Sequence, residues 1–356
     1  MKKLLLEDCC EILDSMRIPI TASERKSGSY PYYGANGIQD YVADYIFDDE
    51  LVLLAEDGGY FGSKTKPIAY RVSGKCWVNN HAHVLKPKKD FNVDYLCYSL
   101  MFYNTDGLVN GATRQKLTQA TMRQMLIPQR AYQEQCDIVA QMNKVNLIIK
   151  TRQNQLQKLD ELVKARFVEL FGDESNPYNF PIVNIEDVAS VRVGVVIKPA
   201  QYYTDAGHGI KTFRSLNIGP MHIKDTDWVY FSEEGNRKNQ KSVLNESDLV
   251  IVRSGAPGTA CVITKEYVGC NAVDIIIARP DLDKVNPYYL CQYTNLPHGK
   301  KQIEEGTGGA AQQHFNVGKY NKIRLTLPPL DQQLKFEKFV EQTDKSKLLQ
   351  FFCFPI

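Results

Sequence analysis

Residues 323–333 carry the stretch Ile323-Arg324-Leu325-Thr326-Leu327-Pro328-Pro329-Leu330-Asp331-Gln332-Gln333, and residues 125–135 carry a second copy of it. Each copy runs from a short apolar strand through proline into a helical pattern. Six positions recur at one constant offset: Gln115, Leu117, Met125, Ile127, Tyr132 and Gln135 correspond to Gln313, Phe315, Ile323, Leu325, Leu330 and Gln333. The spacing is far too long for a solenoid repeat and predicts two similar domains, each closed by a helix.

Both copies extend upstream of the strand. A loop rich in glycine and in polar side chains precedes it, at residues 111–116 in the first copy and 308–314 in the second. Further upstream, Asn92-Val93-Asp94-Tyr95 is echoed by Asn286-Pro287-Tyr288-Tyr289. The duplication therefore covers whole domains rather than a single motif.

Composition excludes several classes of protein. The chain has 356 residues, a formal net charge of +2 and 43% hydrophobic residues, which favours two or three domains with real cores. A near-neutral total does not exclude nucleic acid, because local clustering of charge matters more than the sum. The nine cysteines lack paired spacing and no stretch is apolar enough to span a bilayer, so we expect a reduced, cytoplasmic protein.

Apolar runs and turns predict an α+β fold in which two similar α/β domains stand in tandem, each followed by a long helix. Strands are expected at 51–55, 68–72, 248–252, 260–263 and 274–278; those at 51–55 and 274–278 are expected to be buried and that at 68–72 half-buried. The expected organisation is a first domain, a central helix, a linker, a second domain and a C-terminal helix, over residues 1–128, 129–172, 173–181, 182–328 and 329–356.

The central helix is the clearest element of the sequence. Neither proline nor glycine occurs from Gln133 to Phe171, and Gly172 stands where a C-terminal capping glycine belongs. Its apolar residues follow a heptad pattern, which predicts a coiled-coil seam. The seam positions are Ile138, Met142, Val145, Ile149, Leu156, Leu159, Val163 and Leu170. A rod of this length needs a partner along its apolar stripe.

The helix that follows the second domain is the natural partner. It carries Phe336 and Val340 as seam residues, so we expect an antiparallel coiled coil. Its pattern degrades after Asp344, and the chain ends in an apolar tail, so this second helix is expected to be shortened or truncated.

The sequence offers no catalytic constellation, no cofactor motif and no complete set of metal ligands. His81 and His83 lie two residues apart and would share one face of a strand, but no neighbouring cysteine or carboxylate in the sequence completes a site. We therefore expect them to be core or surface histidines.

Polar residues in loops are the remaining chemical signal. Glutamine recognises adenine, while arginine and lysine recognise guanine or phosphate, so these loops are candidates for contact with DNA. The candidates are Lys64, Lys66, Arg114, Gln115, Lys116, Lys211, Arg214, Arg237, Arg253, Gln312 and Gln313. Two other interpretations stay open: the loops are merely solvated, or Gln115 and Gln313 cap the elements that follow them.

Two domains of this kind, each followed by a helix, together with the Pro328-Pro329-Leu330 signature and Asp248 to Gly255, resemble the specificity subunits of type I restriction–modification enzymes. The resemblance covers essentially the whole chain. It implies two target recognition domains, each binding one half of a bipartite DNA site, and paired helices that act as a spacer.

The resemblance further implies a subunit that is not itself catalytic and that binds double-stranded DNA. Its partners would be methyltransferase subunits, two of them, and a restriction and translocation subunit. A different class of function is also open: a DNA-binding or scaffold protein that dimerises through its long helix without modification partners. A truncated, assembly-impaired specificity subunit is the third possibility.

Overall fold

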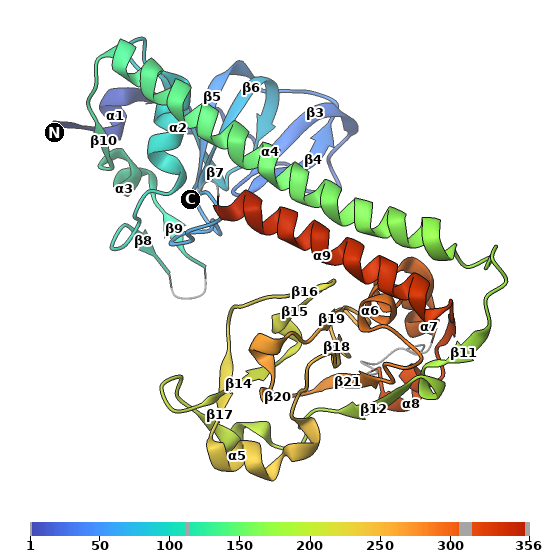
Figure 1. Ribbon diagram of the computed structural model, residues 1–356. Coiled ribbons are helices and arrows are strands. Elements are labelled where there is room, and N and C mark those ends of the chain that lie inside the picture. Colours follow the sequence, from blue (N-terminus) through green and yellow to red (C-terminus); the bar gives the residue numbers. More distant parts are fainter. Residues whose placement is uncertain (1, 112–113, 306–314, 353–356) are drawn as a thin grey trace. The chain divides into compact units, whose positions relative to one another are not determined.

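The computed structural model describes residues 2–111, 114–305 and 315–352 (Figure 1). The chain divides into two compact units, Met1–Thr151 (unit 1) and Arg152–Ile356 (unit 2). The division falls inside the central helix, so the domain limits expected from the sequence stay a prediction.

A six-stranded sheet forms the body of unit 1, with strand order β2-β7-β5-β6-β3-β4. Its central strand β5 pairs antiparallel with both β6 and β7, and its residues from Leu51 to Ala55 are fully buried. The strands are β2 (Cys10–Ile12), β3 (Ser27–Gly34), β4 (Gly37–Val42), β5 (Phe47–Ala55), β6 (Ala69–Val78) and β7 (Ala82–Pro87). The strands predicted at 51–55 and 68–72 are thus confirmed within β5 and β6.

Two short strand pairs and several helices complete unit 1. The pairs are β1 (Lys3–Leu5) with β10 (Leu126–Pro128), and β8 (Val109–Asn110) with β9 (Lys116–Leu117). The helices are α1 (Leu6–Cys9), the 3-10 turn η1 (Asp14–Met16), α2 (Val93–Met101), α3 (Gln119–Arg123) and the first part of α4 (Tyr132–Phe171). Helix α2 packs on the central strands, so one face of the sheet is covered.

Unit 2 repeats this framework with additions. Its core sheet has the order β12-β21-β18-β19, and its pair β11 (Ile182–Asn184) with β22 (Arg324–Thr326) matches the pair β1 and β10. The core strands are β12 (Ala189–Val193), β18 (Leu249–Val252), β19 (Ala260–Val262) and β21 (Ile275–Pro280). The three strands predicted for this domain are therefore confirmed as β18, β19 and β21, although Asp248, Ile263 and Asp274 lie just outside them.

A second four-stranded sheet, which the sequence did not reveal, belongs to unit 2 alone. Its order is β13-β17-β14-β20, and a two-stranded ribbon of β15 and β16 accompanies it. These strands are β13 (Tyr203–Thr204), β14 (Ile210–Phe213), β15 (Ile218–Gly219), β16 (His222–Ile223), β17 (Val229–Phe231) and β20 (Asn271–Ala272). The strands are short and lack a clear alternating pattern, which is why periodicity did not find them.

The helices of unit 2 include the counterparts of those in unit 1. They are α5 (Glu233–Lys238), α6 (Pro287–Asn295), α7 (Pro297–Glu305), α8 (Val317–Asn321) and α9 (Leu330–Phe352). Helices α2 and α6 begin alike: the side chain of Asn92 caps α2 and that of Asn286 caps α6. The echo between these two stretches of sequence is thus a shared helix N-cap.

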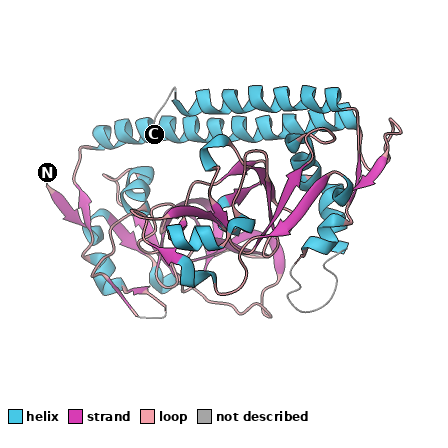
Figure 2. Ribbon diagram, turned by 60° about the horizontal axis from the view of Figure 1, so that its bottom comes forward, coloured by secondary structure: helices cyan, strands magenta, loops and turns pink. Residues whose placement is uncertain are grey.

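Helix α9 packs antiparallel against the C-terminal part of α4 (Figure 2). Phe167 contacts Phe336, with ring centroids 5.3 Å apart, and Asp160 forms a 2.8 Å ion pair with Lys347, about two turns away on α4 and about three turns away on α9. Helix α4 has 40 residues and α9 has 23, so the expected inequality is confirmed. The helical pattern does not end at Asp344, however, because α9 continues to Phe352.

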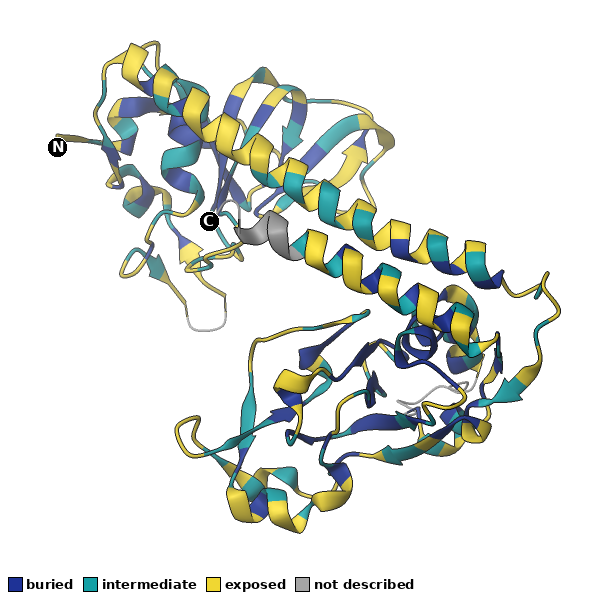
Figure 3. Cartoon of the chain, viewed as in Figure 1, coloured by how far each residue is buried: buried dark blue, intermediate teal, exposed yellow. Residues whose placement is uncertain are grey.

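The end of α4 is fixed by an aromatic cluster rather than by the heptad alone. Phe167 stacks on Tyr289 of α6 at 5.2 Å, and Phe171 meets the same ring edge-on at 4.8 Å. Phe167 and Phe171 are almost fully buried but are not heptad positions. Buried positions recur along the last turns of α4, whereas its middle is largely exposed (Figure 3). Packing onto a globular domain favours a spacing of four residues there, which replaces the coiled-coil period. Gly172 then ends the helix with φ +77°, as expected of a capping glycine.

Candidate nucleic-acid interface

The two units dock the segment after their polar loops in the same way. In unit 1 the backbone N–H of Leu117 donates to the carbonyl of Glu56 at 2.7 Å, and in unit 2 the N–H of Phe315 donates to the carbonyl of Arg253 at 3.1 Å. Glu56 directly follows β5 and Arg253 directly follows β18. The residue that follows each loop is therefore anchored at the end of an inner strand of its sheet.

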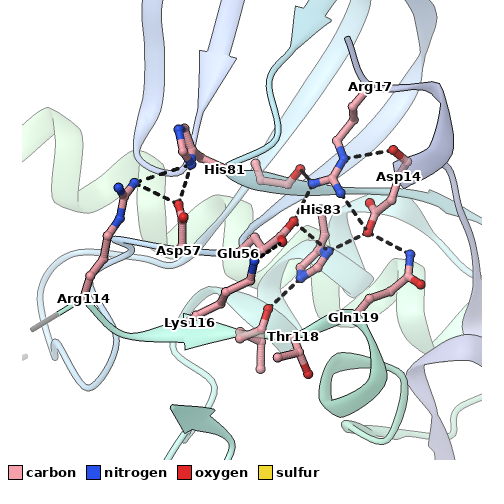
Figure 4. A network of polar contacts seen from close by, with 12 residues as sticks. Asp14, Arg17, Glu56, Asp57, His81, His83, Arg114, Lys116, Thr118 and Gln119 are labelled. Atoms are coloured by element: carbon pink, nitrogen blue, oxygen red, sulfur yellow. Dashed lines mark hydrogen bonds and ion pairs between the residues drawn. The ribbon is translucent and has the colours of Figure 1, made fainter. Parts of the chain in front are cut away.

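A buried polar network lies beside this strand end in unit 1 (Figure 4). The Nδ1 atom of His83 lies 2.7 Å from Asp14 Oδ2, and Arg17 Nη1 donates to Glu56 Oε2 at 2.6 Å. Lys116 Nζ lies 3.0 Å from Glu56 Oε1, so the network reaches the strand β9. His83 is fully buried, and the network joins η1, β5, β7 and β9 through side chains.

His83 is held through both of its ring nitrogens. Its Nε2 atom lies 2.9 Å from the carbonyl oxygen of Leu117, which can only accept, so Nε2 carries a hydrogen. Its Nδ1 atom faces a carboxylate oxygen of Asp14, and Glu56 Oε2 lies 3.7 Å from the same nitrogen.

Both carboxyl groups stay ionised. Burial raises the pKa of Asp14, but hydrogen bonds from His83 and Val84 outweigh it and hold the pKa below its usual value. Burial likewise raises the pKa of Glu56, and hydrogen bonds from Arg17 and Lys116 lower it further than burial raises it. The network is a set of buried ion pairs in which each charged group has a partner.

The expectation that no carboxylate accompanies the two histidines is wrong. Atoms of Asp14, Glu56 and His83 lie within 4.8 Å of one another, a cluster that could in principle hold a metal ion. Protein groups already occupy it, however, since Arg17 and Lys116 bond to Glu56 and both ring nitrogens of His83 lie at hydrogen-bond distance from other protein atoms. The donor set therefore suits an ion-pair network better than a metal. Long-range contacts between η1, β5 and β7 create it, and no local spacing could have shown it.

The candidates Arg114, Gln115 and Lys116 converge at the same strand end. Arg114 Nη2 lies 3.0 Å from Asp57 Oδ1 and 3.4 Å from Nδ1 of His81, while the carbonyl of Gln115 accepts the N–H of Gly58 at 3.1 Å. The side chain of Gln115 is exposed. Three neighbouring polar side chains thus stand on the outer edge of the buried network.

Gln115 does not cap the helix that follows. Thr118 does so, because its side-chain oxygen accepts the N–H of Thr121 at 3.3 Å. The capping hypothesis is therefore wrong for Gln115, and the hypothesis of base contact stays open. The corresponding Gln312 and Gln313 lie outside the described residues.

Lys64 and Lys66 occupy the loop between β5 and β6 and are both exposed. The ammonium group of Lys66 lies 4.5 Å from the centre of the Tyr60 ring, a cation–π contact. This loop begins at Glu56, so the two lysines belong to the same end of the sheet as Arg114.

The candidates of unit 2 are less concentrated. Arg253 Nη1 lies 3.1 Å from Asp274 Oδ1, with only 14% of its side chain exposed. Lys211 bonds to Asp225 at 3.0 Å and covers the Trp228 ring, and Arg214 donates to the carbonyl of Asp227. Arg237 is exposed on α5.

Within the described part of unit 2 these four side chains do not form one cluster. Lys211 and Arg214 both reach toward the segment before β17, whereas Arg253 lies at the end of β18. The pKa of Lys211 is raised, chiefly by its hydrogen bond to Asp225.

The predicted coiled-coil residues have different environments along α4. Val163 is buried in the core of unit 2 with Phe336 and Val340, and Leu170 packs against that core. Leu156, Leu159 and Ile149 are half-buried, and Ile138 packs on the core of unit 1. Met142 and Val145 are 41% and 51% exposed.

None of the helices in the described residues is long and apolar enough to cross a membrane.

Comparison with known proteins agrees with this architecture. Residues 1–161 match the family profile described as type I restriction modification DNA specificity domain. The "Putative type I restriction enzyme specificity subunit S.HindORF215P" of Haemophilus influenzae is 29% identical over 348 residues, which cover 95% of this chain and 86% of that protein. The EcoprrI specificity subunit of Escherichia coli is 24% identical over 127 residues, 35% of this chain and 30% of that protein.

Solved structures show the same fold. The S subunit of a type I restriction–modification system from M. genitalium superposes with a TM-score of 0.55 at 11% identity, covering 98% of this chain and 90% of that one. A chain from "Structural basis underlying complex assembly and conformational transition of the type I R-M system" superposes with a TM-score of 0.53 at 16% identity, covering 98% of this chain and 92% of that one. The chain is therefore similar along its length to specificity subunits of type I restriction–modification systems, and its residues 1–161 match their DNA specificity domain.

Proposed function

We propose that this chain recognises a bipartite DNA target, with unit 1 binding one half-site and unit 2 the other. The observation that carries the proposal is the shared anchoring of Leu117 on Glu56 and of Phe315 on Arg253. One framework anchors the residue that follows the polar loop at the same place in both units, while the side chains around that place differ. Such a design suits two recognition units of different sequence preference.

The identity of the side chains supports contact with DNA. Three consecutive residues of unit 1 suit contact with DNA. Arg114 can bind guanine or phosphate, Gln115 can bind adenine, and Lys116 adds a second cation. Lys64 and Lys66 add positive charge on the neighbouring loop. In unit 2 we assign the same role to Lys211, Arg214, Arg237 and Arg253, together with Gln312 and Gln313.

In this proposal the chain itself catalyses nothing and acts in the cytoplasm. It directs partner subunits to the DNA: methyltransferase subunits, two of them, and a restriction and translocation subunit. The apolar positions Met142 and Val145, exposed on α4, support a role of this helix in assembly. Fixing two recognition units to one chain also raises the effective concentration of the second half-site once the first is bound.

Two measurements test the proposal. Adenine methylation is mapped by single-molecule sequencing in cells that express the chain with its methyltransferase partner, and the expected result is a single bipartite motif. The purified complex is also incubated with a pool of randomised duplex DNA, and the bound fraction is sequenced. Recovery of one continuous short motif, or of no motif, would overturn the proposal.

A further inference from the structure

Each unit holds one arginine against one aspartate at the end of its central strand. In unit 1, Arg114 Nη2 lies 3.0 Å from Asp57 Oδ1, and in unit 2, Arg253 Nη1 lies 3.1 Å from Asp274 Oδ1. The strand pairings show that these two sites occupy corresponding positions in the sheets of the two units. Ala55 of β5 faces Ala82, and Val252 of β18 faces Ile275.

The two pairs are built from different positions of the same framework. In unit 1 the aspartate follows β5 and the arginine precedes β9, whereas in unit 2 the arginine follows β18 and the aspartate precedes β21. Asp274 thus occupies the position that His81 has in unit 1. The backbone hydrogen bonds of Leu117 and Phe315 form with either arrangement of arginine and aspartate. The fold of each unit therefore does not depend on which position supplies the arginine.

The contacts leave part of each guanidinium available. Among the described residues, Arg114 uses only its Nη2 atom, which bonds to Asp57 and lies 3.4 Å from His81. The Nε atom of Arg253 is buried and so cannot reach a ligand, and the ion pair with Asp274 uses Nη1. Each arginine is therefore oriented by a carboxylate through one terminal nitrogen, which leaves its other terminal nitrogen for a ligand.

The neighbouring aspartate makes a DNA base a more favourable ligand for each arginine than a phosphate. A carboxylate beside a guanidinium cancels much of its charge and repels a phosphate, which weakens binding to the DNA backbone. The carboxylate also fixes the direction in which the remaining N–H donors of the guanidinium point. Directed N–H donors are what the O6 and N7 atoms of guanine accept in the major groove.

We infer that Arg114 and Arg253 each bind a guanine, one in each half-site, and that Asp57 and Asp274 are positioning residues that orient them. His81 supports the arrangement in unit 1, since its Nδ1 lies 2.6 Å from the same oxygen of Asp57. The inference rests on the proposed function, because it assumes that each unit binds its own half-site.

The test compares Asp57→Asn and Asp274→Asn in the full chain bound to its methyltransferase partner. Sequence preference is measured by selection from a randomised duplex pool, and non-specific affinity by binding to a duplex of scrambled sequence across a range of salt. Asp57→Asn is expected to lower the preference for guanine at one position by about fivefold. It is also expected to raise affinity for the scrambled duplex, since a negative charge is lost.

Asp274→Asn is expected to do the same in the other half-site only. Asp44→Asn serves as the control, because Asp44 is exposed, carries the same charge and, among the described residues, accepts only the backbone N–H of Tyr45. Arg114→Lys keeps the charge but not the paired donors, so it is expected to lose guanine preference by roughly fivefold or more.

A purely structural role for Asp57 would lower specific and non-specific affinity together, and that outcome would overturn the inference. So would a half-site without guanine, or a guanine preference that Asp57→Asn leaves unchanged. Failure of the proposed function is distinct, because the unaltered chain would then select no bipartite sequence. Thermal unfolding of each variant identifies any that fold poorly.

Discussion

Gln333 Oε1 accepts the backbone N–H of Asn286 at 2.7 Å, and Gln135 accepts that of Asn92 at 2.8 Å in the other unit. Each glutamine also donates to two backbone carbonyls, and both are fully buried. The repeated glutamine therefore ties the start of a closing helix to the start of the helix that packs on the sheet. These hydrogen bonds explain why the glutamine recurs in the sequence.

Replacing this glutamine with an apolar residue of similar size should destabilise its own unit. Gln333→Met is expected to cost about 2–4 kcal/mol in the free energy of unfolding, because it leaves buried backbone groups of Asn286 and Pro328 without partners. Hydrogen exchange resolved by segment measures the effect in unit 2. Gln342→Met, on the exposed surface of the same helix, is the matched control and should change little. Equal losses in both variants would contradict the assignment.

The aromatic cluster at the end of α4 should carry a large share of the stability of unit 2. Phe167→Ala removes a ring that contacts Tyr289, Phe171 and Phe336, and is expected to cost about 3–5 kcal/mol. Chemical denaturation monitored by near-ultraviolet circular dichroism follows the loss. Val168→Ala, 43% exposed on the same turn, provides the comparison. A small effect of Phe167→Ala would show that the cluster is not a core.

Unit 1 should lose stability in acid through its buried ion pairs. The pKa values of Asp14 and Glu56 are lowered in the folded state, so their contribution is fully present above the unfolded-state values, near about pH 4. It is lost as the pH falls through the lower folded-state values. Hydrogen exchange in β5 and β7 across this range should show the loss. In Asp14→Asn the part due to Asp14 should be absent, and an unchanged pH dependence would contradict the network.

Exposed Gln115 should affect only one half of the DNA target. Gln115→Ala keeps the backbone bond from Gly58 and is expected to relax the preference at one base pair by about 1–3 kcal/mol in unit 1's half-site. Methylation mapping of cells expressing the variant measures this preference. Gln124→Ala, another exposed glutamine in unit 1, is the control. Equal loss in both halves would mean that the two units do not recognise DNA independently.

Much of the fold was predictable because it depends on local signals. The duplicated strand–proline–helix stretch, the uninterrupted helix before Gly172 and the apolar runs of β5, β18 and β21 each reflect backbone preference or burial along a continuous segment. The second sheet of unit 2 was missed because its strands are too short to show alternation. The heptad likewise failed to identify Phe167 and Phe171, since their packing partners lie on α6 and α9.

Duplication and periodicity are properties of continuous segments, so the amino-acid sequence alone predicts two similar domains closed by helices. Which polar residues meet follows from the tertiary structure. Asp14, Glu56 and His83 are far apart in sequence, and so are Arg114 and Asp57, yet each set is in contact. Pairing of distant strands brings them together, and burial then makes their charges depend on one another.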